Sequence, residues 1–252
     1  MLKTLAEHNS KYYAAISNVE VRPWGRMYYN TQAPDHIDSN HAEGLSPAAR
    51  NLDKILEEIE AFYAGHGLAP RLRYNQLGFS TELEAQLLER GYNIRPASYK
   101  MMLWNNIPQD GGISPGITVE KVGCHNQVEA LRIILGERSW GLPETLAAIF
   151  AQEMSHPHIQ YFLVRKDQMP AATGFLFSQG GLNRIDNVRT LPNYRKQGCA
   201  SALVKHIQSV YTGSGGRGLY LLAGDFISGL YAKLGFTDLG RIDEFNAWRP
   251  NL

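Results

Sequence analysis

The chain has 252 residues, of which 44% are hydrophobic and 19% charged, the proportions of an ordinary soluble globular protein with one large domain or two small ones. A formal net charge of +1, without a basic stripe or charge run, argues against nucleic-acid and membrane partners. No segment reaches the roughly 18 apolar residues of a membrane span, and the N-terminus lacks the apolar stretch of a signal peptide.

The first segment with a distinct composition covers residues 23–45, which are rich in aromatic, amide and acidic side chains. Clusters of this kind without apolar periodicity are typical of loops. We therefore predict a surface loop. The alternative is that these residues line a site for a cationic amine.

Residues 87–94, LLERGYNI, resemble residues 230–239, LYAKLGFTDL, in a pattern of helix end, glycine, aromatic residue and strand. Each segment precedes a strand that ends near a tryptophan, Trp104 or Trp248. A single recurrence excludes a solenoid. It leaves open whether the two halves of the chain share a fold or match by chance.

Residues 106–116 contain two prolines and three glycines and no apolar periodicity, which predicts a linker. We therefore expect an N-terminal domain at 1–105 and a second domain at 117–252.

The C-terminal half has the clearer pattern of elements. Alternating or β-rich runs predict strands, and apolar stripes at helical spacing predict helices. The expected elements are a strand at 117–122, helices at 125–137 and 143–154, strands at 159–166, 171–178 and 181–190, a loop at 191–198, a helix that begins after Gly198 and stops at Gly213, a strand at 217–224, a short helix at 226–235 and a final strand. This order predicts an α/β fold with a mixed, twisted sheet flanked by helices.

The strongest local signal is the run RKQGCA, residues 195–200, between a strand and an amphipathic helix. Gly198 lets the backbone approach a bulky anion closely, because it has no Cβ. The first N–H groups of the helix have no intrahelical partner, and the helix dipole with Arg195 and Lys196 adds positive potential. These residues predict an anion site, with phosphate as the expected group; the alternative is a tight strand-to-helix connection.

The same six residues resemble the R/Q-x-x-G-x-G/A signature of the Gcn5-related N-acetyltransferase (GNAT) superfamily. Two further segments are similar to the family at suitable spacing: VRTLPNYR, residues 188–195, and GLYAKLGF, residues 229–236. The resemblance covers about half the chain. It implies a GNAT-like fold in the C-terminal half, with acetyl-CoA as the co-substrate and an amine as the acceptor; the N-terminal half would be a degenerate copy if the halves share a fold.

The resemblance also implies roles for individual residues. Backbone groups of three strand residues would contact the pantetheine arm, and the loop and first helical turn would surround the pyrophosphate. Tyr231 matches the tyrosine that often protonates the departing CoA thiolate. The chain departs from the family where an asparagine often stands, at Gly224 and Asp225. The implied cofactor-binding residues are Val188, Arg189, Thr190, Arg195, Lys196, Gln197, Gly198, Cys199, Ala200 and Ser201.

The general base is harder to identify. Asp186 precedes Val188 and Thr190 by two and four residues, so strand alternation places it on their face unless a bulge shifts the register. A carboxylate there could accept the amine proton through a water. The alternative is an ion pair with Arg184 or Arg189.

Histidines and cysteines offer two other readings. The pairs His36 and His41, and His156 and His158, lack the further ligands of a tetrahedral metal site, so we predict solvated loop histidines and no metal. Cys124 and Cys199 are too few for a disulfide framework, which fits a cytoplasmic protein. Cys199 is expected to be a small filler, although a thiol beside an anion site could act as a nucleophile.

The sequence thus predicts an acetyl-CoA-dependent N-acetyltransferase that acts on a primary amine of a small molecule or peptide. Two alternatives are a non-catalytic CoA-binding or sensing module and an acyltransferase that uses another acyl-CoA. Pairing of sheet edges between chains would allow a homo-oligomer.

Overall fold

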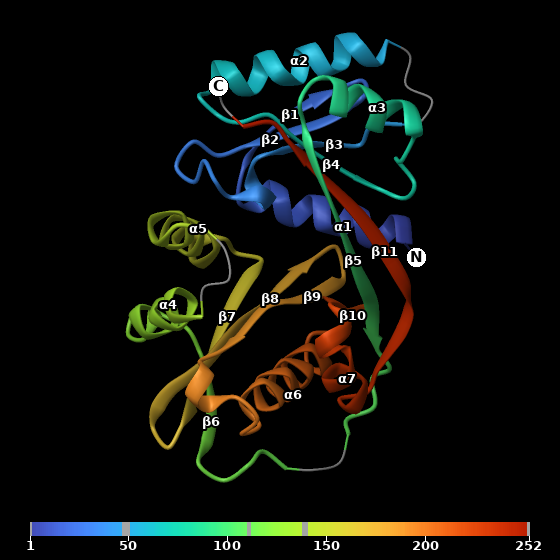
Figure 1. Cartoon of the computed structure of the whole chain (residues 1–252). Helices are drawn as coiled ribbons and strands as arrows, with labels where there is room; N and C mark the ends of the chain where they lie inside the picture. Colours follow the sequence, from blue (N-terminus) through green and yellow to red (C-terminus); the bar gives the residue numbers. More distant parts are fainter. Residues whose placement is uncertain (1, 47–50, 110–111, 138–140, 251–252) are drawn as a thin grey trace. The chain divides into compact units, whose positions relative to one another are not determined.

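The computed structural model describes residues 2–46, 51–109, 112–137 and 141–250. The chain divides into two compact units, which we describe separately (Figure 1). Unit 1 consists of Met1–Ser98 and Ile242–Leu252, and unit 2 of Tyr99–Arg241. No helix in the described ranges is long and apolar enough to cross a bilayer.

Unit 1 combines helices with a small mixed sheet. Strands β1, β2 and β3 pair antiparallel, β3 and β4 run parallel, and β4 pairs antiparallel with the end of β11. The elements are α1 (Leu2–Ala15), β1 (Asn18–Arg22), β2 (Gly25–Tyr29), the 3-10 helix η1 (Ile37–Ser39), β3 (His41–Glu43), α2 (Leu52–Gly65), β4 (Arg71–Asn75), α3 (Thr81–Glu89), the start of β5 (Asn93–Trp104) and the end of β11 (Phe236–Trp248).

Helix α2 provides much of the core of unit 1. Leu52, Leu56, Ile59 and Tyr63 recur at helical spacing and are all buried, so one face of the helix packs on the sheet. Helix α3 begins at Ser80, whose hydroxyl accepts the N–H of Leu83 at 3.0 Å, a typical N-cap.

The predicted surface loop at 23–45 is wrong. The segment contains β2, η1 and β3. Met27, Tyr28 and Ala42 are at most 1% exposed and belong to the interior of unit 1. The prediction failed because short strands with aromatic and polar residues lack the long apolar periodicity that marks a buried element.

Unit 2 has a larger mixed sheet with the strand order β5-β10-β9-β8-β7-β6. Only β9 and β10 are a parallel pair, and the other pairs are antiparallel. The elements are the end of β5, β6 (Ile117–Lys121), α4 (Gln127–Gly136), α5 (Pro143–Ser155), β7 (Ile159–Lys166), β8 (Met169–Gln179), β9 (Leu182–Thr190), the 3-10 helix η2 (Pro192–Tyr194), α6 (Cys199–Thr212), β10 (Gly218–Ala223), α7 (Asp225–Lys233) and the start of β11.

The predicted order of elements after residue 117 is confirmed throughout. Helix α6 buries Leu203, Val204, Ile207 and Tyr211 in the core of unit 2, as the apolar stripe predicts. Gly213 follows its last residue as the C-cap. The predicted linker, 106–116, connects β5 to β6 within unit 2.

The two units repeat one topology. Three consecutive antiparallel strands, β1–β3 in unit 1 and β7–β9 in unit 2, are followed by a helix, a strand parallel with the third, a second helix and a last strand; unit 2 has β6 in addition. The glycine after each second helix, Gly91 or Gly235, has a positive φ of 79° or 83°, a conformation that favours glycine. The similarity between residues 87–94 and 230–239 therefore reflects a structural repeat.

The halves of the chain exchange their last strands. Residues 100–103 of β5, from the N-terminal half, pair with β10 in unit 2. Residues 244–248 of β11, from the C-terminal half, pair with β4 in unit 1. Each sheet is thus completed by a strand from the other half of the sequence.

Candidate functional site

The predicted anion site lies where α6 begins. Gly198 is its N-cap with a φ of 88°, and Lys196 has a φ of 59°. The first backbone bond of the helix runs from the N–H of Ala202 to the oxygen of Gly198 at 2.9 Å. The N–H groups of Cys199, Ala200 and Ser201 precede that bond and remain available to an anion. We call Lys196–Ser201 the cradle.

The cradle requires glycine at position 198. A Cβ there would lie 2.9 Å from the hydroxyl of Ser114, and the positive φ disfavours any other residue. The residues present therefore fit the pyrophosphate of an acyl-CoA, which needs a close approach to backbone N–H groups.

The side chains beside the cradle have different partners. Arg195 forms an ion pair with Glu137 and donates to the oxygen of Thr190 at 3.3 Å. The amide of Gln197 donates to the oxygen of Asn193 at 2.7 Å. Lys196 is exposed. Of the two cations expected to face a phosphate, Arg195 is thus already engaged by a carboxylate.

Strands β9 and β10 pair over a short stretch. Their register joins only Leu182, Asn183 and Arg184 of β9 to residues 218–220 of β10. The remainder of β9, up to Thr190, has no β10 partner in that register. The backbone of the later residues is thus not used in pairing with β10, as the resemblance implies for Val188, Arg189 and Thr190.

Strand β9 contains a bulge. Its pairing with β8 shifts between Thr173↔Arg189 and Phe175↔Asp186, so Gly174 alone opposes Asn187 and Val188. Asn187 has a φ of 53°, which asparagine tolerates better than most residues. A Cβ on Gly174 would lie 3.2 Å from the Cα of Val188.

The bulge changes the expected position of Asp186. Asp186 is opposite Phe175, whereas Thr190 is opposite Ala172, a residue of the core beneath α6. Directly opposed residues share a face of the sheet, so Asp186 and Thr190 lie on opposite faces, the outcome that the sequence allowed if a bulge shifted the register. Asp186 forms an ion pair with Arg184, the alternative that the sequence left open.

Tyr231 lies on α7 in the core of unit 2, against which Val188 also packs. It is 7% exposed, and its ring meets that of Phe236 edge to face at 6.0 Å. Burial raises the pKa of Tyr231 to about 12. The hydroxyl therefore keeps its proton at neutral pH, the state that an acid requires.

Cys199 is buried in the same core, and burial raises the pKa of its thiol. A protonated, buried thiol is a poor nucleophile, which favours the filler role. At the position of the family's asparagine, Gly224 is the N-cap of α7 and Asp225 pairs with Arg241 at 2.9 Å.

The predicted solvated histidines are only partly confirmed. His158 is exposed and His156 half-buried, but His36 and His41 are 2% and 1% exposed. The prediction is wrong for His36 and His41 because η1 and β3 are part of the unit 1 interior. Within the described ranges, no group of three His, Cys, Asp or Glu side chains could hold a metal ion.

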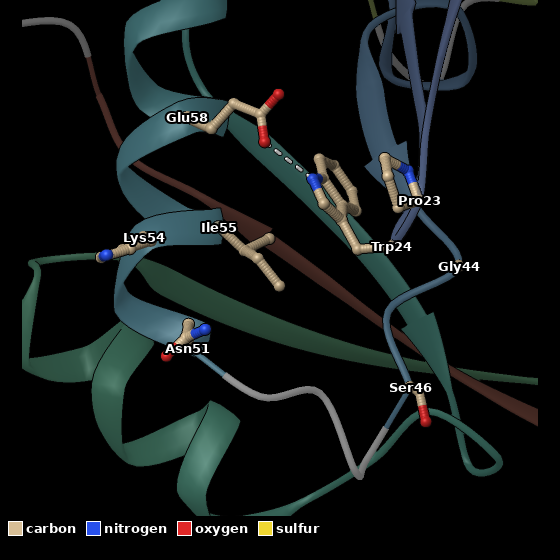
Figure 2. Close-up of a pocket in the computed structure, with 8 residues that line it drawn as sticks. All are labelled: Pro23, Trp24, Gly44, Ser46, Asn51, Lys54, Ile55 and Glu58. Atoms are coloured by element: carbon tan, nitrogen blue, oxygen red, sulfur yellow. Dashed lines mark hydrogen bonds between the residues drawn. The ribbon is translucent and has the colours of Figure 1, made fainter.

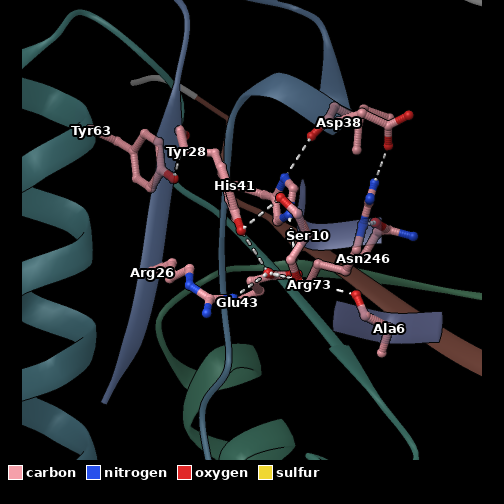
Figure 3. Close-up of polar contacts among 11 residues, drawn as sticks. Ala6, Ser10, Arg26, Tyr28, Asp38, His41, Glu43, Tyr63, Arg73 and Asn246 are labelled. Carbon is pink, nitrogen blue, oxygen red and sulfur yellow. Dashed lines mark hydrogen bonds and ion pairs between the residues drawn. The ribbon is translucent and has the colours of Figure 1, made fainter. Parts of the chain in front are cut away.

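His41 is the centre of a buried polar group in unit 1 (Figure 3). Its ring lies 4.8 Å from that of Tyr13 and 5.0 Å from that of Tyr28. Its Nδ1 donates to the oxygen of Ile37 at 3.1 Å, which directs Nε2 toward Glu43 Oε2 at 3.8 Å. Burial lowers the pKa of His41.

Two further groups complete this arrangement. The hydroxyls of Ser10 and Tyr28 donate to Glu43 Oε1 at 2.5 and 2.9 Å. The guanidinium of Arg73 pairs with Asp38 at 2.7 Å and donates to Asn246 at 3.0 Å. We call these residues, with His41, the His41 cluster. Buried charges of this kind must be paired to be tolerated.

Unit 1 also has a pocket of about 550 Å³ beside the start of α2 (Figure 2). Figure 2 shows the indole of Trp24 facing α2, where its N–H donates to Glu58 at 2.8 Å. The same carboxylate accepts a bond from Arg22 at 2.6 Å. The pocket is lined by Pro23, Trp24, Gly44, Ser46, Asn51, Lys54, Ile55 and Glu58.

Sequence reasoning allowed for a bulge in β9 but did not locate it or identify the residues that surround it. Two signals could have indicated it. An isolated glycine within a strand pattern, Gly174 in AATGFLFS, often marks a bulge. Asn187 opposite it is a residue type that favours positive φ.

Two solved structures share the fold of nearly the whole chain. A GCN5-related N-acetyltransferase from Kribbella flavida is 17% identical, with 99% of this chain and 95% of that chain covered and a TM-score of 0.71. A conserved protein of unknown function from Staphylococcus epidermidis ATCC 12228 is 14% identical, with 94% and 95% covered and a TM-score of 0.69. At such identities the likeness shows the fold alone, and it extends over both units.

Residues 128–236 match the model of the acetyltransferase (GNAT) family. The resemblance inferred from the cradle is thus confirmed. "Uncharacterized N-acetyltransferase YitI" of Bacillus subtilis (strain 168) is 34% identical over 65 residues. The match spans 26% of this chain and less than half, 44%, of that relative. For residues 128–236, the match to this family indicates acyl transfer from an acyl-CoA.

Proposed function

We propose that the chain transfers an acetyl group from acetyl-CoA to a primary amine of a small molecule or peptide, with catalysis in residues 117–252. The observation that carries this proposal is the cradle. Gly198 with its positive φ and the unpaired start of α6 form a phosphate-binding geometry at the family's signature position. The end of β9 that has no β10 partner lies in the segment that leads to it.

Each group in the site has a chemical task. The cradle would bind the pyrophosphate through the N–H groups of Cys199, Ala200 and Ser201. Backbone groups at Val188–Thr190 would hold the pantetheine arm. Holding the thioester and the amine together would supply the largest part of the acceleration, and N–H groups near the bulge would stabilise the oxyanion.

The transfer balances with one acid and one base. The neutral amine attacks the thioester carbon, the carbon–sulfur bond breaks, and the amine proton leaves for a base. Tyr231, protonated at neutral pH because of its raised pKa, would give its proton to the departing thiolate. Asp186, 36% exposed and paired with Arg184, would accept the amine proton through a water.

Calorimetric titration with acetyl-CoA tests the proposal. The natural chain should bind with a single saturable isotherm, and Gly198→Trp should lose binding because its side chain would fill the space near Ser114. A matched control is Gly91→Trp, at another glycine with positive φ but in unit 1. No binding by the natural chain, or binding by Gly198→Trp as tight as by the natural chain, would refute the proposal.

A second candidate is a CoA-binding or sensing module without turnover. The observation that favours it is the replacement of the family's asparagine by Gly224 and Asp225, of which Asp225 is paired with Arg241. Saturable binding of acetyl-CoA together with no turnover on a broad amine panel would support the module. Comparing acetyl-, succinyl- and longer acyl-CoA would identify a different acyl donor.

A further inference from the structure

A continuous line of hydrogen bonds runs beneath the bulge in β9. The hydroxyl of Tyr161 donates to Glu153 Oε2 at 2.6 Å and accepts from the amide of Asn187 at 3.0 Å. The guanidinium of Arg189 donates to Asn187 Oδ1 at 2.6 Å. Both ends of the Asn187 amide are thus fixed, one by a strand neighbour and one by β7.

The line is anchored to two helices. Arg189 also donates to the backbone oxygens of Ile134 and Glu137 at 3.2 and 3.1 Å, at the end of α4. Glu153 belongs to α5. Carbonyls at a helix C-terminus carry partial negative charge and have no intrahelical partner, so a buried guanidinium is a suitable donor to them.

The side chains of this network lie in the interior of unit 2 and not on its surface. Tyr161, Glu153 and Arg189 are 1%, 2% and 8% exposed. The ring of Tyr161 also packs against those of Phe150 and Phe175, at 5.0 and 5.2 Å. Burial raises the pKa of Tyr161 well above its ordinary value, so its hydroxyl stays protonated and donates to the carboxylate.

The positive φ of Asn187 explains why a hydrogen-bond network is needed at the β9 bulge. A non-glycine residue at positive φ carries a cost of about 1–3 kcal/mol and persists where its surroundings fix it. Asn187 is that residue, and its backbone N–H is held by the carboxylate of Asp186 at 2.7 Å. The same bulge sets the direction of the backbone at Val188, where the thioester would lie.

We propose that Glu153, Tyr161, Asn187 and Arg189 form a positioning network that holds the β9 bulge, and with it the backbone N–H groups that stabilise the oxyanion. This role rests on the proposed acyl transfer. None of the four side chains needs to touch the substrate. Their effect is on the chemical step, because a displacement of about 1 Å in a catalytic group can cost 10²-fold in rate.

The test compares two buried Tyr→Phe substitutions. Tyr161→Phe removes the hydroxyl that joins Glu153 to Asn187. Tyr63→Phe is the matched control, since its hydroxyl is equally buried and donates to the oxygen of Tyr28 at 2.9 Å in unit 1. Both should lower stability to a similar extent, which thermal unfolding checks.

In the acyl-transfer assay, Tyr161→Phe should lower kcat about tenfold or more. The KM for acetyl-CoA should stay within about twofold of that of the natural chain, because the cradle is unchanged. Asn187→Gly retains easy access to positive φ but loses both side-chain bonds, so it should lower kcat similarly. Full kcat in either variant, or an equal fall in Tyr63→Phe, would overturn the proposal.

Amide hydrogen exchange supplies a readout that needs no turnover. Peptides that cover residues 182–190 should exchange faster in Tyr161→Phe than in the natural chain and should not change in Tyr63→Phe. If the natural chain transfers no acyl group, the proposed function fails and exchange alone decides whether the network holds the bulge. Unchanged exchange at 182–190 in Tyr161→Phe would show that it does not.

Discussion

The two units share a topology but differ where a parallel strand leads into a helix. In unit 2, β9 has nine residues, contains the bulge, and enters α6 through Gly198. In unit 1, β3 has three residues and is followed by Gly44, with Asn51 as the N-cap of α2. The topology alone therefore does not make a catalytic site. We expect the length of the third strand and the residues at the helix start to decide where such a site forms.

The pocket of unit 1 lies at the position that corresponds to the cradle, beside the start of α2. Its chemistry is different, because the carboxylate of Glu58 lines it and is held in place by Trp24 and Arg22. A carboxylate disfavours a bound phosphate. Unit 1 also has the His41 cluster, and we expect its polar residues to serve stability.

The strand exchange gives the largest expected effect. The fragment 117–252 lacks β5 and β4, so β10 would lose its antiparallel partner and residues 244–248 of β11 would lose theirs. We expect this fragment to be unfolded, as seen by circular dichroism and by the lack of a cooperative thermal transition. A cooperative transition in 117–252 would show that the exchange is dispensable and that the halves are independent.

Arg73→Met tests the His41 cluster. The substitution removes the partner of Asp38 and Asn246 and the cation that lies 4.9 Å from the ring of Tyr13. Breaking a fully buried charge pair costs about 3–5 kcal/mol, and we expect the low end of that range here because Asp38 is 34% exposed. Urea unfolding should show that loss, whereas acetyl-CoA affinity at low urea should not change. Lost affinity in the folded variant would mean that the two units are coupled.

Acid should destabilise unit 1 before unit 2. Burial lowers the pKa of His36 from 6.5 to about 4, so the unfolded chain binds more protons between these values. Stability from neutral His36 is therefore present above pH 6.5 and falls by roughly 3 kcal/mol as the pH approaches 4. For Glu43, burial alone would raise the pKa, but the contact with His41 and the bonds from Ser10 and Tyr28 lower it, which adds a loss below about pH 4.5.

Hydrogen exchange between pH 7 and 4.5, corrected for the intrinsic rate, measures this difference. Protection in α2 and β3 should fall more than protection in α6. His36→Gln should reduce the pH dependence in unit 1. Equal losses in both units, or an unchanged slope in His36→Gln, would contradict the assignment.

Tyr231→Phe has the smallest expected effect in free energy. Removing a general acid should lower kcat about 10²-fold, or roughly 2.7 kcal/mol, with little change in the KM for acetyl-CoA. Because the pKa of Tyr231 is about 12, its loss of activity at alkaline pH should begin only above about pH 11. An unchanged kcat would remove Tyr231 from the acid role. The Tyr231→Phe variant keeps the packing with Phe236 and should therefore fold like the natural chain, so a fall in kcat would not reflect unfolding.

The sequence by itself determined most of unit 2. The periodic runs after residue 117 predicted each helix and strand, because long segments with one buried face leave a clear pattern. The strand-to-helix junction at Gly198 was also predictable, since glycine stands directly before an amphipathic helix. Anion binding there stays a prediction. These features depend on contacts between residues close in sequence.

Only the tertiary structure decided the rest. The bulge at Asn187 depends on Gly174 in the neighbouring strand. The side chain of Asn187 has two partners, Tyr161 and Arg189, which belong to two different strands. The burial of His41 depends on other elements, which supply the rings of Tyr13 and Tyr28 that pack against it. The strand exchange pairs residues more than 100 positions apart. The local periodicity of a segment does not reveal such partners, because burial and register are set by the elements that pack on the segment and not by the segment alone.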